Sequence, residues 1–173
     1  MVAILVNQRN VEDVRKWDQE GRNVQDYCLG FMFDITGRAV VLIRKRRPVW
    51  QRGKWNGVGG HVEDGESAIQ AMTREFLEET GMATPIDVWT HVAVLRGQGP
   101  DGEFRLHIFS SFCGVCNVKT TTDEEVSRFL VSQLPPDAIS NLTWLIPLCL
   151  DSGTRKPVLI GYLTGESHGE IKT

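Results

Sequence analysis

The sequence predicts a single α/β domain, and three observations support that prediction. Segments rich in β-branched and aromatic residues, bounded by turn residues, lie on both sides of one amphipathic helix at residues 67–81. A chain of 173 residues is about one domain long and can bury a sizeable core. It contains no internal repeat and no low-complexity linker. We therefore expect one domain over residues 1–173, with residues 1–24 as an extension and residues 164–173 as a loose tail.

The remaining elements follow in a simple order. A turn at residues 34–38 makes a hairpin of the first two predicted strands, and a Gly-rich turn at residues 97–102 joins the next two. A second helix is predicted at residues 141–150. Pro147 has no N–H to donate, and only the amides in the first turn of a helix need no carbonyl partner. Pro147 therefore fits only if that helix begins near Thr143. The predicted strands are residues 27–33, 39–44, 88–95, 104–118 and 157–163.

Composition indicates an ordinary soluble protein. The net charge of −3 gives no overall attraction for nucleic acid, so no stable nucleic-acid partner is expected. No apolar run approaches the ~18 residues of a membrane span, and the start of the chain lacks the basic region of a signal peptide. A cytoplasmic protein is the simplest inference. The four cysteines are expected to be reduced, including Cys113 and Cys116, and a short helix is predicted after Asn10.

The helix at residues 67–81 has clear signals at both ends. Ser67 and Gln70 form a capping-box pattern, and Gly81 suits the left-handed residue that ends a helix. Its opposite face is apolar enough to pack on a sheet through Ile69, Met72, Phe76 and Leu77.

Three glutamates on this helix predict a metal site. Glu75, Glu78 and Glu79 stand at i, i+3 and i+4, which places them within one face roughly 100° wide. Like charges at that spacing repel each other, so a positive partner is expected. A hard divalent cation, Mg²⁺ or Mn²⁺, prefers such oxygen ligands.

The stretch from Gly60 to Met82 reads G-H-V-E-D-G-E-S-A-I-Q-A-M-T-R-E-F-L-E-E-T-G-M. It resembles a complete Nudix box, G-x5-E-x7-R-E-U-x-E-E-x-G-U with U apolar, and every specified position is filled. The resemblance implies an α/β/α sandwich with a mixed central sheet. It also implies metal-dependent hydrolysis of a nucleoside diphosphate joined to another group.

Roles for single residues follow from the same resemblance. Glu66 and Arg74 would form an ion pair that fixes the helix against its loop. The water could be activated by Glu79 itself or by a glutamate in the loop before the second helix, with Glu125 preferred to Glu124. The alternative for that loop is a solvated acidic turn. The implied metal ligands are the carbonyl of Gly60 and the carboxylates of Glu75, Glu78 and Glu79.

A basic run at residues 44–54 contains six Lys or Arg residues in eleven. Alone it could bind nucleic acid or another acidic surface, or it could be a solvated loop. Beside a metal-binding helix, some of its side chains can instead neutralise phosphate oxygens. Arg44 and Arg46 share one side of an extended strand end and are the candidates.

The substrate is suggested by W-N-G-V-G-G at residues 55–60, which resembles the MutT-type branch that acts on oxidised purine nucleoside triphosphates. The resemblance implies that Asn56 contacts the purine and that Trp50 lies beside it. Asn141 stands where that branch has an acidic residue at the base edge, and an amide differs from a carboxylate because it both donates and accepts. The expected reaction converts a purine (d)NTP to the monophosphate and pyrophosphate. The alternatives are hydrolysis of ADP-ribose, nucleotide sugars or dinucleotides, and a non-catalytic nucleotide- or RNA-binding module.

Overall fold

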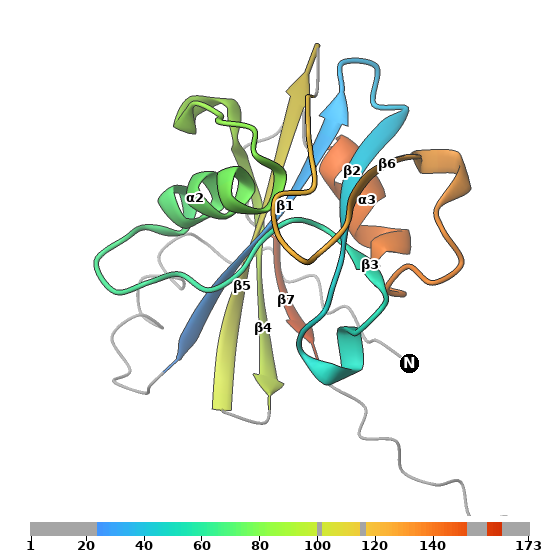
Figure 1. Ribbon diagram of the computed structural model, residues 1–173. Coiled ribbons are helices and arrows are strands. Elements are labelled where there is room, and N and C mark those ends of the chain that lie inside the picture. Colours follow the sequence, from blue (N-terminus) through green and yellow to red (C-terminus); the bar gives the residue numbers. More distant parts are fainter. Residues whose placement is uncertain (1–23, 100–101, 115–116, 152–158, 164–173) are drawn as a thin grey trace, which may run out of the picture.

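A seven-stranded sheet is the middle layer of the molecule, and one helix covers each of its faces (Figure 1). The computed structural model describes residues 24–99, 102–114, 117–151 and 159–163. The strands are β1 (Gln25–Asp34), β2 (Ala39–Arg44), β3 (Trp55–Asn56), β4 (Thr90–Gly99), β5 (Gly102–Cys113), β6 (Val126–Leu130) and β7 (Leu159–Leu163). Their order in the sheet is β3-β2-β1-β5-β4-β7, with β6 also paired to β2.

The sheet is mixed because its strands pair in both directions. β1 runs parallel to β5, and β4 runs parallel to β7. β2 is antiparallel to β1, β3 and β6, and β4 is antiparallel to β5. Central parallel strands are apolar on both faces and need cover on each side. The predicted α/β/α sandwich with a mixed central sheet is confirmed.

Helix α2 (Ala68–Thr80) covers one face, and both of its predicted ends are confirmed. A capping box of Ser67 and Gln70 begins it, and Gly81, with φ of 66°, ends it in the left-handed conformation. Gly30 of β1 lets the helix come close, since a Cβ there would lie 2.4 Å from the Met72 sulfur. The core cluster under α2 consists of Cys28, Met32, Val41, Ile43, Val58, Ala71, Met72, Phe76, Trp89 and Phe109.

Leu77 does not pack on the sheet as expected, because 47% of it is exposed, whereas Glu79 is 8% exposed. Viewed down the helix, Leu77 lies about 100° from Phe76, and Glu79 lies about 60° from it on the other side. The carboxylate face therefore borders the apolar face instead of opposing it. Burying Phe76 against the sheet also buries Glu79.

Helix α3 (Leu142–Asp151) covers the other face and begins within one residue of the expected position. Pro147 nevertheless lies inside it, so the expectation that this proline requires a first-turn position is wrong. A proline inside a helix costs about 3 kcal/mol, whereas each large apolar side chain contributes roughly 1.5–3 kcal/mol when buried. The residues of α3 that are buried here are Leu142, Leu145, Ile146 and Cys149.

The five predicted strands are all present, with changed limits. β5 ends at Cys113, and β4 and β5 extend to Gly99 and Gly102, into the stretch predicted as the turn between them. β3 and β6 were not among the predicted strands. The predicted helix after Asn10 and the tail at residues 164–173 lie outside the described residues.

Two expectations about the whole chain can also be compared. Cys113 is disulfide-bonded, so the expectation of reduced thiols is wrong for it, while Cys28 and Cys149 are buried thiols. Across the described parts of the chain, no helix is both long and apolar enough to cross a membrane.

A polar cluster joins β1, β5 and β4 on the α2 side of the sheet. The Asp26 carboxylate accepts hydrogen bonds from the Arg105 guanidinium at 2.6 and 2.7 Å and lies 3.0 Å from Nε2 of His107. The His91 ring stacks on Phe109 with ring centroids 4.8 Å apart. Burial, with the nearby His107, lowers the pKa of His91 to about 4.

His91 should therefore make the protein less stable in mild acid. Below pH 6.5 the unfolded chain takes up a proton at His91, whereas the folded chain does so only near pH 4. The unfolded state thus binds more protons in this window, and the free energy of unfolding falls by up to about 1.4 kcal/mol per pH unit. Urea unfolding between pH 7 and 4.5 should show a weaker pH dependence for His91→Gln than for the wild type. The control His61→Gln, at an exposed histidine, should keep the wild-type slope, and an unchanged slope in His91→Gln would refute the assignment.

Candidate active site

Arg74 connects helix α2 to the loop that precedes it. Its guanidinium lies 2.6 Å from Oε1 of Glu66 and 2.9 Å from Oε1 of Glu75. It also lies 3.2 Å from Oε2 of Glu78 and donates to the carbonyl of His61 at 2.9 Å. One cation on the helix therefore holds three carboxylates and a loop carbonyl in place.

Gly60 lies directly against Glu75. A Cβ on Gly60 would stand 2.4 Å from Oε1 of that carboxylate, so a side chain at this position would displace the carboxylate. The Gly60 carbonyl accepts a hydrogen bond from the Cys28 N–H at 2.9 Å and keeps one lone pair. Burial raises the pKa of Glu75. The loop and the helix thus bring two oxygen donors together.

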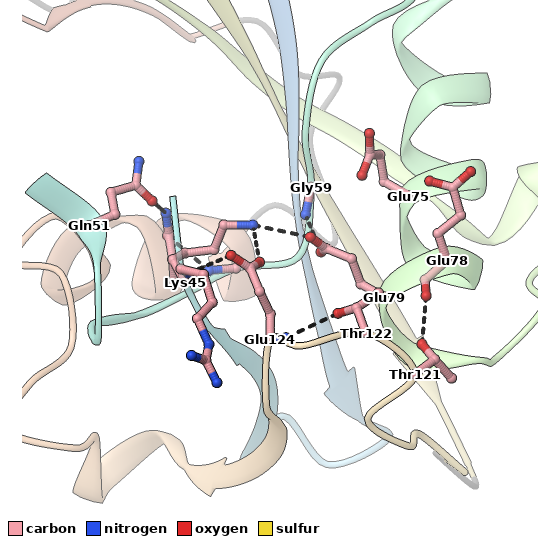
Figure 2. Close-up of polar contacts among 12 residues, drawn as sticks. Lys45, Gln51, Gly59, Glu75, Glu78, Glu79, Thr121, Thr122 and Glu124 are labelled. Atoms are coloured by element: carbon pink, nitrogen blue, oxygen red, sulfur yellow. Dashed lines mark hydrogen bonds and ion pairs between the residues drawn. The ribbon is translucent and has the colours of Figure 1, made fainter. Parts of the chain in front are cut away.

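A second cluster surrounds the buried end of Glu79 (Figure 2). The ammonium group of Lys45 lies 3.1 Å from Oε1 of Glu79 and 2.6 Å from Oε2 of Glu124. The other oxygen of Glu79 accepts the Gly59 N–H at 3.1 Å. The three charged side chains are only 10–14% exposed.

Burial dominates the electrostatics of this cluster. It raises the pKa of Glu79 to about 7, even though Lys45 and the Gly59 N–H act in the opposite direction. Burial would lower the pKa of Lys45, but Glu79 and Glu124 outweigh it and raise that pKa. Glu79 therefore has a carboxylate that can hold or release a proton near neutral pH.

The pairing of β2 with β6 explains why Glu124 enters the site. Ile43 pairs with Val126, and the N–H of Arg44 still bonds to the carbonyl of Glu125 at 2.8 Å. Continuing this register sets Lys45 opposite Glu124, on the face toward α2. Glu125 points to the other side, where it lies 3.9 Å from Arg44 and is 58% exposed.

The loop before β6 is fixed to the end of α2. The Thr121 hydroxyl donates to the carbonyl of Glu78, and the Lys119 N–H donates to the carbonyl of Thr80 at 2.8 Å. These bonds satisfy carbonyls that a helix end leaves without partners. They also hold Glu124 beside Glu79.

Lys45 was missed in the sequence, although a signal for it existed. In a strand, side chains alternate between faces, and Val41 and Ile43 belong to the α2-side core. Lys45 continues that alternation, so it points toward α2 while Arg44 and Arg46 point away. Val126 also packs on the α2-side core, and Glu124, two residues before it, falls on the same face. This alternation would have favoured Glu124 over Glu125.

The predicted metal ligands fit a divalent cation in chemistry and in charge. When ionised, the five glutamates of the two clusters face two cations, Arg74 and Lys45, which leaves an excess of negative charge. All donors are hard oxygens. As placed, the carboxylates turn toward these two cations, and the described residues include no three acidic, His or Cys side chains that converge as a metal site.

The two predicted phosphate-binding arginines lie at a hollow of about 600 Å³ next to Lys45. Arg44 donates from Nε to the carbonyl of Gly53 at 3.1 Å and lies 3.3 Å from Asp137. Arg46 donates from Nε to the carbonyl of Asp123 at 2.9 Å. The lining residues are Arg44, Lys45, Arg46, Arg47, Arg52, Gly53, Asp123 and Glu125.

The three predicted base contacts lie at the other end of the Gly-rich loop. Asn56 is buried, and its amide donates to the Gln51 side chain at 3.1 Å. Trp50, in the short 3-10 turn η1 (Val49–Gln51), is 60% exposed. The segment before α3 runs beside β3, because Ala138 bridges to Trp55, and Oδ1 of Asn141 is buried without a partner among the described residues.

Comparisons with known proteins show what this chain is similar to. An oxidized purine nucleoside triphosphate hydrolase of Danio rerio is 48% identical over 46 residues, which are 27% of this chain and 28% of that protein. A mutator MutT protein of Bacillus halodurans superposes with a TM-score of 0.61 at 19% identity, over 82% of this chain and 90% of that one. The NUDIX domain of Shewanella oneidensis NrtR, solved with ADP ribose, has a TM-score of 0.64 at 14% identity, over 83% and 97%.

The matched part of the Danio rerio protein is well under half of its length, and the two solved structures show the fold alone. The model of the NUDIX domain, however, matches residues 26–146, which include every side chain of the two carboxylate clusters. This chain belongs to the NUDIX domain family.

Proposed function

We propose that this protein is a divalent-metal-dependent pyrophosphohydrolase of the MutT type. It would convert a purine nucleoside triphosphate to the monophosphate and pyrophosphate. The observation that carries the proposal is the buried carboxylate cluster of α2, held against the Gly-rich loop through Gly59 and Gly60. The similarity to oxidized purine nucleoside triphosphate hydrolases supports the substrate class.

The loop between Asn56 and Gly60 has a suitable length for a nucleotide. Gly59 is three positions after Asn56, and three steps of extended chain span roughly 10 Å. A base beside Asn56 would therefore place its phosphates near Glu79, Lys45 and the basic hollow. Arg44 and Arg46 would neutralise phosphate oxygens there.

Mg²⁺ or Mn²⁺ would be held by the Gly60 carbonyl and by Glu75, Glu78 and Glu79. When bound, the cation supplies charge neutralisation at the phosphates and makes water easier to deprotonate. Arg74 orients two of these carboxylates and anchors them to the loop through Glu66.

The proton of the attacking water needs an acceptor near the phosphates. Glu79 can take it, because its carboxylate lies beside Lys45 and the Gly-rich loop, where the phosphates would be held. Glu124 is the second candidate, since it shares Lys45 with Glu79. Glu125, preferred from the sequence, is exposed beside Arg44 on the other side of the strand, away from Glu79.

A panel of nucleoside triphosphates and ADP-ribose, incubated with Mg²⁺, tests the proposed reaction. Release of pyrophosphate and a monophosphate from purine triphosphates is the expected result. Cleavage of ADP-ribose with no turnover of any triphosphate would contradict it.

Glutamine substitutions should distinguish the buried glutamates, which we expect to act in the reaction, from the exposed Glu125. Glu79→Gln should lower kcat by about 10²-fold or more, because it removes both a metal donor and a proton acceptor. Glu124→Gln should lower it by about tenfold or more, whereas the matched control Glu125→Gln should stay within roughly threefold. The measurement is steady-state pyrophosphate release, with thermal unfolding to verify the fold. Full activity in Glu79→Gln, or a larger loss in Glu125→Gln than in Glu124→Gln, would reject these roles.

Gly60→Ala should weaken metal binding without unfolding the protein. The new Cβ would lie 2.4 Å from Oε1 of Glu75 and would push that carboxylate away from the loop. We expect Mn²⁺ affinity, measured by electron paramagnetic resonance, to fall by roughly tenfold, in line with disturbed ligand orientation. Gly114→Ala is the control, since no atom lies within 4 Å of its Cβ position. Equal Mn²⁺ affinity in the two variants would show that Glu75 and Gly60 do not share a cation.

A further inference from the structure

We infer that Gln51 determines which base the site accepts, by presenting hydrogen-bond donors that select purines with a carbonyl at C6. This inference rests on the proposed function, because it concerns the base of the same nucleotide. It depends on a chain of hydrogen bonds that begins at the backbone of the Gly-rich loop and ends on the Gln51 side chain.

The backbone sets the orientation of Asn56. The N–H of Gly57 lies 2.8 Å from Oδ1 of Asn56, and a backbone N–H can only donate. The amide oxygen of Asn56 must therefore face Gly57, and its nitrogen must face the other way. Because Asn56 is only 8% exposed, water offers little alternative for either atom.

Asn56 then sets the orientation of Gln51. Nδ2 of Asn56 donates to Oε1 of Gln51 at 3.1 Å, so the amide oxygen of Gln51 is turned inward. The amide nitrogen of Gln51 consequently points away from this contact, as Figure 2 shows. Each side-chain amide is thus fixed by the group before it, starting from one backbone N–H.

The chain of hydrogen bonds from the Gly57 N–H through Asn56 to Gln51 forms a relay, and the side of it that faces away from the loop backbone is rich in donors. Asn56 uses one of its two N–H groups on Gln51, and no contact among the described residues uses the amino group of Gln51. Up to three N–H groups from the two side chains are therefore available to a ligand, against one remaining lone pair on each amide oxygen, and both oxygens are turned toward the relay's own donors.

The relay lies where a base would be held. Gln51 follows Trp50 in the turn η1, and the 60% exposed indole is free to stack on an aromatic ring. Asn56 leads into the loop that reaches Glu79 through Gly59. A nucleotide with its phosphates at the carboxylates would bring its base edge to Gln51 and Asn56.

Donors at this position distinguish the two classes of purine. Guanine and hypoxanthine carry an acceptor, O6, at the edge where adenine carries an amino donor. At C6, adenine would set its amino donor against the donors of the relay and leave polar groups unpaired, which costs affinity. The structure therefore predicts that 6-oxopurine nucleotides bind more tightly than adenine nucleotides, by about tenfold or more.

Gln51→Glu reverses the polarity of the relay without changing its shape. The variant keeps an oxygen for the Asn56 N–H but replaces the outward amino group with an acceptor oxygen. IMP and AMP differ at the base only in the C6 group and in the proton on the neighbouring N1, so the ratio of their dissociation constants reports how the site reads this edge. Added negative charge repels both monophosphates equally and cancels in the ratio.

The experiment measures the binding of IMP and AMP by calorimetry, which requires no turnover. Wild type should prefer IMP, and Gln51→Glu should shift the IMP-to-AMP ratio toward AMP by about tenfold or more. Gln98→Glu, the same change on β4, should leave the ratio unaltered. Gln51→Met should weaken IMP binding without improving AMP binding, and it keeps the test valid if the charged variant fails to fold.

Two outcomes would overturn the inference. The first is an equal ratio in wild type and both Gln51 variants, and the second is a wild-type preference for AMP. Either can occur while triphosphates are still hydrolysed, so the proposed reaction would survive. Conversely, a shifted ratio without hydrolysis of any triphosphate would support the role of Gln51 and reject the proposed reaction.

Discussion

The constraint that shapes this molecule is the placement of several carboxylates on one face of a short helix beside a hydrophobic core. Glu75 and Glu79 repel each other and also lose hydration, because their helix must bury Phe76 next to them. Positive charge has to reach them from elsewhere. Arg74 supplies it along the helix surface, and Lys45 supplies it from the end of β2.

The sheet makes that second contact possible and separates the roles of two neighbouring glutamates. Because β2 and β6 pair with their side chains in alternation, Lys45 and Glu124 face α2 while Arg44 and Glu125 face solvent. A shift of one residue in this register would exchange the two pairs. The bonds from Lys119 and Thr121 to the end of α2 resist such a shift.

Features set by nearby residues were predictable from the sequence, and features set by packing were not. The ends of α2 depend on Ser67, Gln70 and Gly81, which act within one turn, and both were predicted correctly. Pro147 inside α3 was not predicted, because that helix is held mainly by burial of its apolar face. Glu124 and Lys45 become neighbours only through strand pairing, so the sequence could indicate their faces but not their contact.

The backbone of residues 57–60 connects the two ends of the proposed site. The Gly57 N–H orients Asn56 and Gln51, the Gly59 N–H holds Glu79, and Gly60 makes room for Glu75. The Gly59–Gly60 end of this loop is charged and crowded, whereas the Asn56 end has neutral side-chain amides with unused hydrogen-bonding groups. A neutral amide can be exchanged for another acceptor or donor at little electrostatic cost, but a buried carboxylate cannot. On the proposed function, base selection can therefore change at η1 while the charged cluster stays as it is.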